Sequence, residues 1–197
     1  MDLENHLNKK VGHWALLKHP FYQAWESGDL PVDALRTYSS EYGAFIKLLP
    51  DGWEILGDTT TAAEERDHAE LWRQFALALG TEVKDAALPA VAELVNTSKR
   101  LFSNSPTALG ALYAFEVQQP STSMSKLEGL RKFYGLHAGA EDYFETHSNN
   151  QHEAAKLLGL ISALTQEEAQ QAIEACEELG KALWNALTDI YQAHCTV

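Results

Sequence analysis

Acidic and histidine side chains recur in three separate stretches of the chain, each of which is expected to be helical. In chain order these candidates are Glu64, Glu65, His68, Glu116, His147 and His152. Carboxylates and imidazoles that project inward from different helices are how helical proteins hold pairs of iron or manganese ions. The residue types therefore indicate a metal centre, and centres of this kind carry out oxygen or redox chemistry.

The first stretch offers two alternative pairs. Glu64 and His68 are four residues apart, and Glu65 and His68 are three apart; both spacings place two side chains on one face of a helix. Either carboxylate could therefore bind a metal together with His68. Glu116 is the stronger indication, because it lies within the apolar run 111–117. A buried carboxylate is costly unless a cation or a hydrogen-bond donor meets it.

The third stretch presents His147 and His152, which are five residues apart. On an ideal helix that separation turns the two imidazoles about 140° away from each other, so both can reach one ion only where the helix is bulged. Asn150 and Gln151 share the face of His147, and an amide oxygen is a weaker ligand for iron than a carboxylate. We therefore expect His147 to be a ligand, with His152 or Gln151 as candidates to complete the set.

The elements that must position these residues are helices nearly throughout. Ala, Leu and Glu are abundant and runs of β-branched residues are absent, which is typical of helices rather than strands. Apolar periodicity, prolines and glycines predict helices over residues 3–18, 20–28, 31–57, 59–79, 88–102, 105–134 with an interruption at Pro120, 139–164 with an irregularity at 148–150, and 165–194. We expect a single all-α domain over residues 1–197, a bundle of roughly seven or eight helices.

Composition and charge exclude several classes of partner. The formal net charge of −13 argues against nucleic acid and against an anionic membrane surface, because both attract basic proteins. No apolar run approaches the roughly 18 residues needed to span a bilayer, and the first residues lack the layout of a signal peptide. Cys176 and Cys195 are too few for a disulfide framework, so we expect a cytoplasmic protein with reduced thiols.

With these residues in view, the chain resembles the heme-oxygenase-like helical superfamily that includes TenA-type proteins and PqqC. Within it, the greatest similarity is to the CADD-like group, named for a chlamydial protein associating with death domains. The resemblance spans most of the chain and rests on the segments and residues 19–25, Tyr38, Tyr42, 68–75, 111–120, Lys126 and 143–147. It implies a heme-oxygenase-like bundle of helices that forms a homodimer.

The resemblance also implies an activity. CADD-like enzymes hold iron, as a di-iron or an iron–manganese pair, activate dioxygen, and make para-aminobenzoate with one of their own tyrosines as the carbon source. Carried over by position, the metal ligands are Glu64, His68, Glu116 and His147, and the consumed tyrosine is Tyr22. A supporting tyrosine falls on Tyr38 and a functional lysine on Lys126. We therefore expect an iron-dependent oxidase or oxygenase that acts on a small molecule or on Tyr22.

Departures from the family pattern leave two alternatives open. Gln151 and Ala154 stand where the family has an aspartate and a histidine, and an incomplete ligand set would bind one ion or none. With no ion bound, the chain would be a metal-free binding protein of the same fold. The second alternative is an enzyme of the TenA or PqqC type, but Cys176 and Cys195 both fall in the last helix, which leaves the TenA reaction without a candidate nucleophile.

Overall fold

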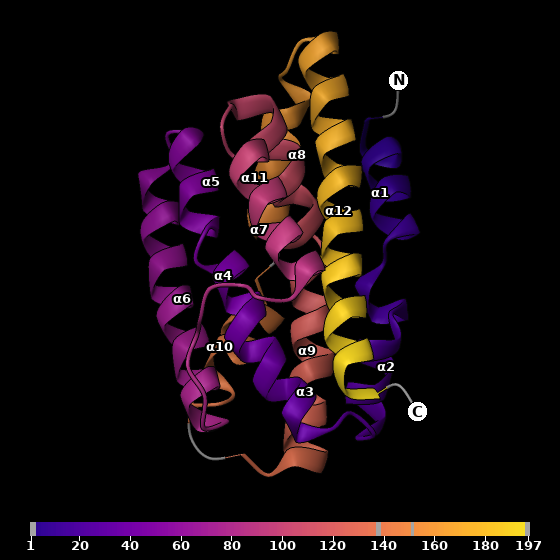
Figure 1. The fold of residues 1–197 in the computed structure, drawn as a ribbon. Helices are drawn as coiled ribbons and strands as arrows, with labels where there is room; N and C mark the ends of the chain where they lie inside the picture. Colours follow the sequence, from indigo (N-terminus) through magenta and orange to yellow (C-terminus); the bar gives the residue numbers. More distant parts are fainter. Residues whose placement is uncertain (1–2, 137–138, 151, 196–197) are drawn as a thin grey trace.

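The longest helix, α12 (Gln166–Cys195), runs along one side of the molecule and packs against α8 (Ser105–Glu116), α7 (Pro89–Leu101) and α1 (Leu3–His13) (Figure 1). The computed structural model describes residues 3–136, 139–150 and 152–195, and within these ranges no residue belongs to a strand. The expected all-α fold is confirmed. None of the helices in these ranges is both long and apolar enough to cross a membrane.

A second layer lies on the far side of α8 from α12. It contains α5 (Leu49–Ile55) and α6 (Thr59–Ala78), which pack against each other, and α10 (Asp142–Ser148), which packs on α6 (Figure 1). The short helix α10 also packs on α9 (Gln119–Gly129), and α11 (His152–Ser162) packs on α8. The three stretches with candidate ligands therefore belong to helices that meet around the middle of the bundle.

Helix α8 is the centre of the core. Every residue from 108 to 116 is buried, which is expected of a helix that is covered on all sides. At Gly110 the backbones of α8 and α12 approach so closely that a β-carbon would lie 1.8 Å from the carbonyl oxygen of Ala172. Because α8 is held this deeply, its last residue, Glu116, is also inside the protein.

Several expected helices are divided. The helix expected over residues 31–57 consists of α3 (Val32–Thr37), the π-helical turn η2 (Tyr38–Tyr42), α4 (Gly43–Ile46) and α5. A second π-helical turn, η3 (Leu130–Tyr134), follows α9. Such turns widen a helix locally and are frequent at functional sites; η2 places Tyr38 and Tyr42 in the core.

His19 links the short 3₁₀ helix η1 (Leu16–Lys18) to α2 (Pro20–Ser27) and has no nitrogen left for a heme iron. Its Nδ1 accepts a hydrogen bond from the backbone N–H of Phe21 (3.0 Å), so its Nε2–H donates to Thr188 Oγ1 (2.9 Å). His19→Ala removes this cap and should lower the free energy of unfolding by about 1–2 kcal/mol. Urea denaturation tests this, and His19→Asn, which keeps a capping side chain, should recover part of the loss. Equal loss in both variants would contradict the capping role.

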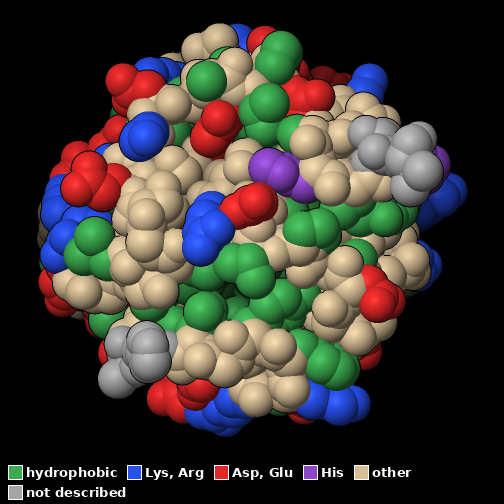
Figure 2. Space-filling model, turned by 60° about the horizontal axis from the view of Figure 1, so that its bottom comes forward, with side chains coloured by type: hydrophobic (Ala, Val, Ile, Leu, Met, Phe, Trp, Pro, Cys, Tyr) green, Lys and Arg blue, Asp and Glu red, His purple; other side chains and the backbone are tan. Residues whose placement is uncertain are grey.

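The face of the molecule in Figure 2 shows acidic and basic side chains interspersed around hydrophobic ones. Basic side chains on this face do not gather into a patch. A nucleic-acid site would be expected to show such a patch; the exclusion of nucleic acid drawn from the net charge of −13 stays a prediction.

Candidate metal centre

Helix α6 carries the first pair of candidate ligands. The carboxylate of Asp58 caps its first turn by accepting from the backbone N–H of Thr61 (3.2 Å), which fixes where the helix begins. Glu65 and His68 follow on one face, and Glu65 Oε1 lies 2.9 Å from His68 Nδ1. Glu65 is buried and its second oxygen, Oε2, has no hydrogen-bond partner. Spacing in the sequence allows either Glu64 or Glu65 to pair with His68. In the structure Glu65 is buried, and Glu64 is exposed on the outer side of the same helix.

Helix α8 ends at the second candidate, Glu116, whose side chain is 2 % exposed. Its Oε1 is buried without a hydrogen-bond partner. Burial, together with the nearby charges of Glu153 and Glu65, raises the pKa of Glu116 well above its ordinary value. A carboxylate placed here is therefore strongly favoured to take up a proton or a metal ion.

His147, on α10, is oriented as a metal ligand. A carbonyl oxygen can only accept a hydrogen bond, so His147 Nδ1–H donates to the carbonyl of Tyr143 (2.7 Å). Its Nε2 then carries a lone pair, and this buried atom has no partner. Burial, with a further contribution from the charge of His68, lowers the pKa of His147 to about 3. The ring is therefore neutral at physiological pH and lies 4.4 Å from the ring of His68, centre to centre.

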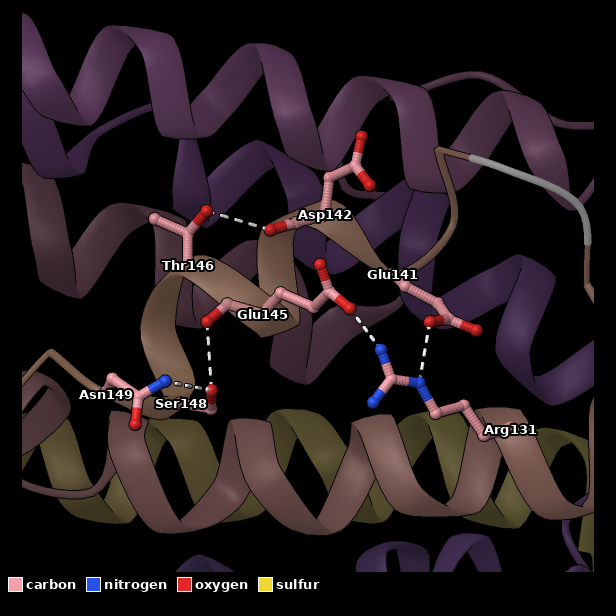
Figure 3. Close-up of polar contacts among 7 residues, drawn as sticks. All are labelled: Arg131, Glu141, Asp142, Glu145, Thr146, Ser148 and Asn149. Atoms are coloured by element: carbon pink, nitrogen blue, oxygen red, sulfur yellow. Dashed lines mark hydrogen bonds and ion pairs between the residues drawn. The ribbon is translucent and has the colours of Figure 1, made fainter.

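A break between α10 and α11 brings in a fifth side chain, Glu153. Helix α10 ends at Ser148, whose hydroxyl donates to the carbonyl of Glu145 (2.9 Å), and Asn149 Nδ2 donates to the Ser148 hydroxyl (3.3 Å) (Figure 3). Helix α11 begins again at His152. Glu153 is 2 % exposed, and neither of its carboxylate oxygens has a hydrogen-bond partner.

Arg131, in η3, anchors α10 from its other end. Its guanidinium donates from Nε to Glu141 (2.7 Å) and from Nη2 to Glu145 (Figure 3). These ion pairs are exposed, so each contributes little to stability. They nevertheless tie the turn after α9 to the short helix that carries His147.

Together these side chains form two overlapping groups whose ligand atoms lie within 4.8 Å of one another. One group is Glu65, His68 and His147, and the other is Glu65, Glu116 and Glu153. Three carboxylates and two imidazoles meet in the interior, and five of their atoms lack any hydrogen bond: Glu65 Oε2, Glu116 Oε1, His147 Nε2 and both oxygens of Glu153. Buried acids in contact are untenable as anions without a cation. The residues present therefore fit a metal ion, and a mixed set of imidazole and carboxylate suits iron or manganese.

The remaining predicted ligands lie at the rim of this group. Glu64 and His152 are exposed, and their ligand atoms lie within 4.8 Å of each other and of Glu153. Gln151 falls outside the described residues. Glu153 was missed by sequence reasoning, because a continuous helix would turn it about 120° away from His147. The polar run 148–150 was the available signal, since such a run commonly interrupts a helix and so resets its phase.

The three candidates away from the metal group, Tyr22, Tyr38 and Lys126, form a pocket of their own. Lys126, on α9, lies with Nζ 3.5 Å from the hydroxyl of Tyr22 and 3.4 Å from that of Tyr38, and the two hydroxyls are 3.3 Å apart. The same Nζ sits 5.0 Å from the ring centre of Phe144. Among the described residues no carboxylate pairs with the amine, and burial lowers the pKa of Lys126 to about 7. Burial raises the pKa of Tyr22 and Tyr38.

Aromatic rings connect the pocket to the metal group. Between ring centres, His147 lies 4.1 Å from Tyr143, Tyr143 lies 4.8 Å from Trp72, and Trp72 lies 5.2 Å from Tyr38. Gln119 Nε2 donates to the hydroxyl of Tyr143 (2.8 Å) and fixes that ring. Successive oxidisable side chains are thus in contact all the way from the candidate ligands to Tyr22.

A surface hollow of about 450 Å³ opens beside the metal group, with Glu116 in its lining together with Val117, Met124 and Ser148. A larger hollow of about 890 Å³ lies elsewhere, next to Ile161 and Ile173, and none of the candidate residues lines it. Neither cysteine belongs to the described metal group: both lie on α12, and Cys176 is buried.

Comparison with known proteins places this geometry in a family. Residues 50–184 match the family described as iron-containing redox enzymes. The 4-aminobenzoate synthase of Chlamydia pneumoniae is 30% identical over 92% of this chain and 92% of its own length. The similarity to the CADD-like group predicted from the motifs is confirmed by this match.

Solved structures show the same fold at lower sequence identity. A domain of unknown function with a heme oxygenase-like fold from Shewanella denitrificans superimposes with a TM-score of 0.81 at 18% identity, covering 98% of this chain and 93% of that one. A CADD-like protein of unknown function from Nostoc punctiforme gives a TM-score of 0.62 at 18% identity, covering 98% of both chains. The expected heme-oxygenase-like fold is confirmed, and the chain belongs to the family of iron-containing redox enzymes.

Proposed function

We propose that this protein is an iron-dependent oxygenase that makes 4-aminobenzoate from its own Tyr22, with Lys126 as the source of the amine. The observation that carries the proposal is the approach of Lys126 Nζ to within 3.5 Å of the Tyr22 hydroxyl, inside a buried pocket. Dioxygen is the small-molecule substrate, and the iron-containing redox family and the 4-aminobenzoate synthase relative support this assignment.

The chemistry of the product explains why that contact matters. 4-Aminobenzoate is a benzene ring with a carboxyl carbon and an amine at opposite positions. A tyrosine side chain has the same ring, with a carbon at one position and an oxygen opposite to it. To convert one into the other, the amine must replace the phenolic oxygen, which leaves as water, and the Cε–Nζ bond of Lys126 must break. The Cα–Cβ bond of Tyr22 must also break, with Cβ oxidised to the carboxyl carbon by dioxygen. A nitrogen is therefore needed at the phenolic oxygen. Lys126 Nζ is the nitrogen that the fold places there.

The pocket prepares Lys126 for this role. A free amine has a lone pair and an ammonium ion does not, so only the neutral form can attack a ring carbon. Because burial brings the pKa of Lys126 to about 7, about half of the side chains are neutral near pH 7. Tyr38, whose hydroxyl lies 3.3 Å from that of Tyr22 and 3.4 Å from the amine, holds the two reacting groups together and can pass a proton between them.

The metal group supplies the oxidising power. Glu65, His68, Glu116, His147 and Glu153 would hold the metal, with Glu65 shared between its two groups, an arrangement that suits a pair of ions, di-iron or iron–manganese. Metal bound there supplies the reduction of dioxygen. The rings of Tyr143 and Trp72 give an electron withdrawn from the Tyr22 pocket a continuous aromatic route to His147. Burial excludes water from this route.

Isotope labelling tests the proposal. Protein made with ring-labelled ¹³C-tyrosine, loaded anaerobically with ferrous iron and then given a reductant and dioxygen, should release labelled 4-aminobenzoate, at most one per chain. Tyr22→Phe should release none, because its ring has no oxygen to replace. Tyr113→Phe is the matched control, since its hydroxyl contacts Asn8 on α1 instead of the pocket, and it should behave as the unmodified protein.

Mass spectrometry of product and protein separates the outcomes. Unlabelled product would show that the ring comes from an external substrate, and undiminished product from Tyr22→Phe would contradict the role of Tyr22. Elemental analysis of the loaded protein should find about two metal ions per chain for a complete pair; an absence of bound metal would contradict the oxygenase itself. A homodimer, a single domain over residues 1–197 and a cytoplasmic location stay predictions.

A further inference from the structure

Two exposed side chains stand next to the buried metal group without belonging to it. Glu64 lies on α6 and His152 at the start of α11, and both are exposed. Their ligand atoms lie within 4.8 Å of each other and of a carboxylate oxygen of Glu153. Glu153 also belongs to the inner group with Glu65 and Glu116, again within 4.8 Å. A single buried carboxylate is therefore shared by an exposed trio and a buried one.

We propose that Glu64, His152 and Glu153 form an outer cation site that captures a divalent metal ion at the surface and passes it inward through Glu153. The proposal rests on the metal centre proposed above and adds the route by which that centre is filled. The exposed side chains of Glu64 and His152 meet the hydrated ion first. Glu153 is 2 % exposed, and neither of its carboxylate oxygens has a hydrogen-bond partner. Its carboxylate can therefore take the ion from Glu64 and His152 and pass it to the inner group.

The ligand types define which ions the outer site would accept. One imidazole nitrogen and two carboxylates favour first-row divalent metals such as Fe²⁺, Mn²⁺ or Co²⁺ over Ca²⁺ and Mg²⁺, which prefer all-oxygen sites. Three protein ligands leave room for water, so an ion at the rim keeps part of its hydration shell. The inner group offers Glu65, Glu116 and the two imidazoles of His68 and His147 in addition to Glu153. The inner group has more ligands and is more deeply buried than the outer one, so the ion should bind there more tightly and stay there.

The need for such a route follows from burial. Glu65, Glu116 and His147 are each 1 or 2 % exposed, so a hydrated ion cannot meet them directly. On the described surface, two places adjoin the inner group: the exposed side chains of Glu64 and His152, and the hollow lined by Glu116 and Met124. The first place carries two metal-binding side chains outside the inner group, whereas the hollow is lined by apolar and hydroxyl side chains apart from Glu116 itself. Of the two, the rim at Glu64 and His152 has the greater affinity for a cation.

Metal loading of the metal-free protein tests the proposal, with Co²⁺ as the probe because its visible absorption reports nitrogen and oxygen ligation. The double variant Glu64→Gln/His152→Gln removes the outer ligands and leaves the inner group intact. We expect its rate of Co²⁺ uptake in stopped flow to fall about tenfold, as for the loss of electrostatic capture, while the final stoichiometry stays that of the unmodified protein.

A matched control separates the effect of losing the outer ligands from the effect of changing the net charge. Glu70→Gln/His13→Gln makes the same two substitutions at exposed positions, with Glu70 paired to Arg73 on the same helix α6, and should load at the unmodified rate. Equal slowing in this control would overturn the outer site, and so would unchanged loading in the Glu64→Gln/His152→Gln variant. Ser121→Trp fills the hollow beside Glu116. If this variant loads slowly while Glu64→Gln/His152→Gln loads at the unmodified rate, the hollow is the entrance for the ion and the proposal is overturned.

The test also separates this inference from the proposed function. If the unmodified protein takes up no Co²⁺, the metal centre itself is contradicted and the outer site falls with it. If the unmodified protein loads and the rim variant loads equally fast, only the outer site is overturned. In Glu116→Gln, weak Co²⁺ binding that disappears on adding Glu64→Gln and His152→Gln would support the outer site directly.

Discussion

Replacing Glu116 with glutamine should abolish stoichiometric iron binding and, at the same time, raise the stability of the metal-free protein by roughly 2–4 kcal/mol. Glu116 is buried beside two other acids, Glu65 and Glu153, and its Oε1 lacks a hydrogen-bond partner. An amide of the same shape carries no charge to desolvate and can donate to the neighbouring carboxylates. The substitution therefore relieves the cost of the empty site while it removes a ligand.

The dependence on pH distinguishes this explanation from a general packing effect. Burial raises the folded-state pKa of Glu116 above its unfolded value. Above the unfolded pKa, near 4.3, the unfolded chain has lost a proton that the folded protein still holds, so stability falls as pH rises. The gain in Glu116→Gln should therefore be nearly absent at pH 4 and should grow as the pH rises from 5 to 8.

Urea denaturation of metal-free protein across this pH range, with and without ferrous iron under anaerobic conditions, provides the measurement. Iron should stabilise the unmodified protein, because a ligand that binds only the folded state favours it, and should leave Glu116→Gln unchanged. Glu70→Gln, an exposed acid on α6, is the control and should keep the iron effect. Retained stoichiometric iron, or a less stable metal-free variant, would contradict the assignment of Glu116.

The candidate site was predictable from the sequence where one helix decides the geometry. Spacing alone relates Glu65 to His68, and the apolar run 111–117 marks Glu116 as buried. Spacing could not choose between Glu64 and Glu65, because both share a face with His68 and the choice depends on which side of α6 the rest of the bundle covers. That is a tertiary property, and it places Glu65 inside and Glu64 outside.

Breaks in helices were the part of the fold that local patterns located only in part. Prolines and glycines correctly predicted where α2 begins at Pro20 and ends before Gly28, because both residues have strong local preferences. The polar run 148–150 marks the interruption after Ser148, whereas the π-helical turn η2 arises where packing overrides the regular repeat. The interruption moves Glu153 into the site, and the size of the change in helix phase, which local patterns do not give, is why this ligand is absent from the sequence prediction.

The pocket of Tyr22, Tyr38 and Lys126 illustrates a third limit. Tyr22 and Lys126 are 104 residues apart in the chain and become neighbours only through the packing of α2 against α9. No periodicity links them, and only the resemblance to the CADD-like group singled them out before the structure. The structure adds that, in the part of the chain it describes, the amine contacts two tyrosine hydroxyls and pairs with no acid.

That unpaired amine leads to the second large effect. Lys126→Met should stabilise the protein by roughly 3–5 kcal/mol at pH 7 and abolish 4-aminobenzoate formation. Lys126 is 2 % exposed, and burial lowers its pKa to about 7 from an ordinary value of 10.5. Methionine fills a similar volume without a charge to desolvate. A protein that keeps lysine at this position thus gives up stability for a function.

The sign of the pH dependence follows from the same shift. Between pH 7 and 10.5 the unfolded chain keeps a proton on Lys126 that the folded protein has released. The free energy of unfolding of the unmodified protein should therefore rise with pH in this window, by about 1.4 kcal/mol per pH unit relative to Lys126→Met. The advantage of the methionine variant should be greatest at pH 7 or below and should have largely vanished near pH 10.

Denaturant unfolding of metal-free protein at pH 7, 8, 9 and 10 measures this difference, and Lys181→Met, at an exposed position on α12, serves as the control with no pH-dependent gain. A Lys126→Met variant that is less stable than the unmodified protein at pH 7 would show that the ammonium form is well accommodated. The neutral amine would then be too rare to attack the ring of Tyr22, and the proposed source of nitrogen would have to be abandoned. If Lys126→Met is instead more stable and its advantage fades with rising pH, burial of Lys126 disfavours the ammonium form. The same burial then produces the neutral amine that the proposed reaction needs.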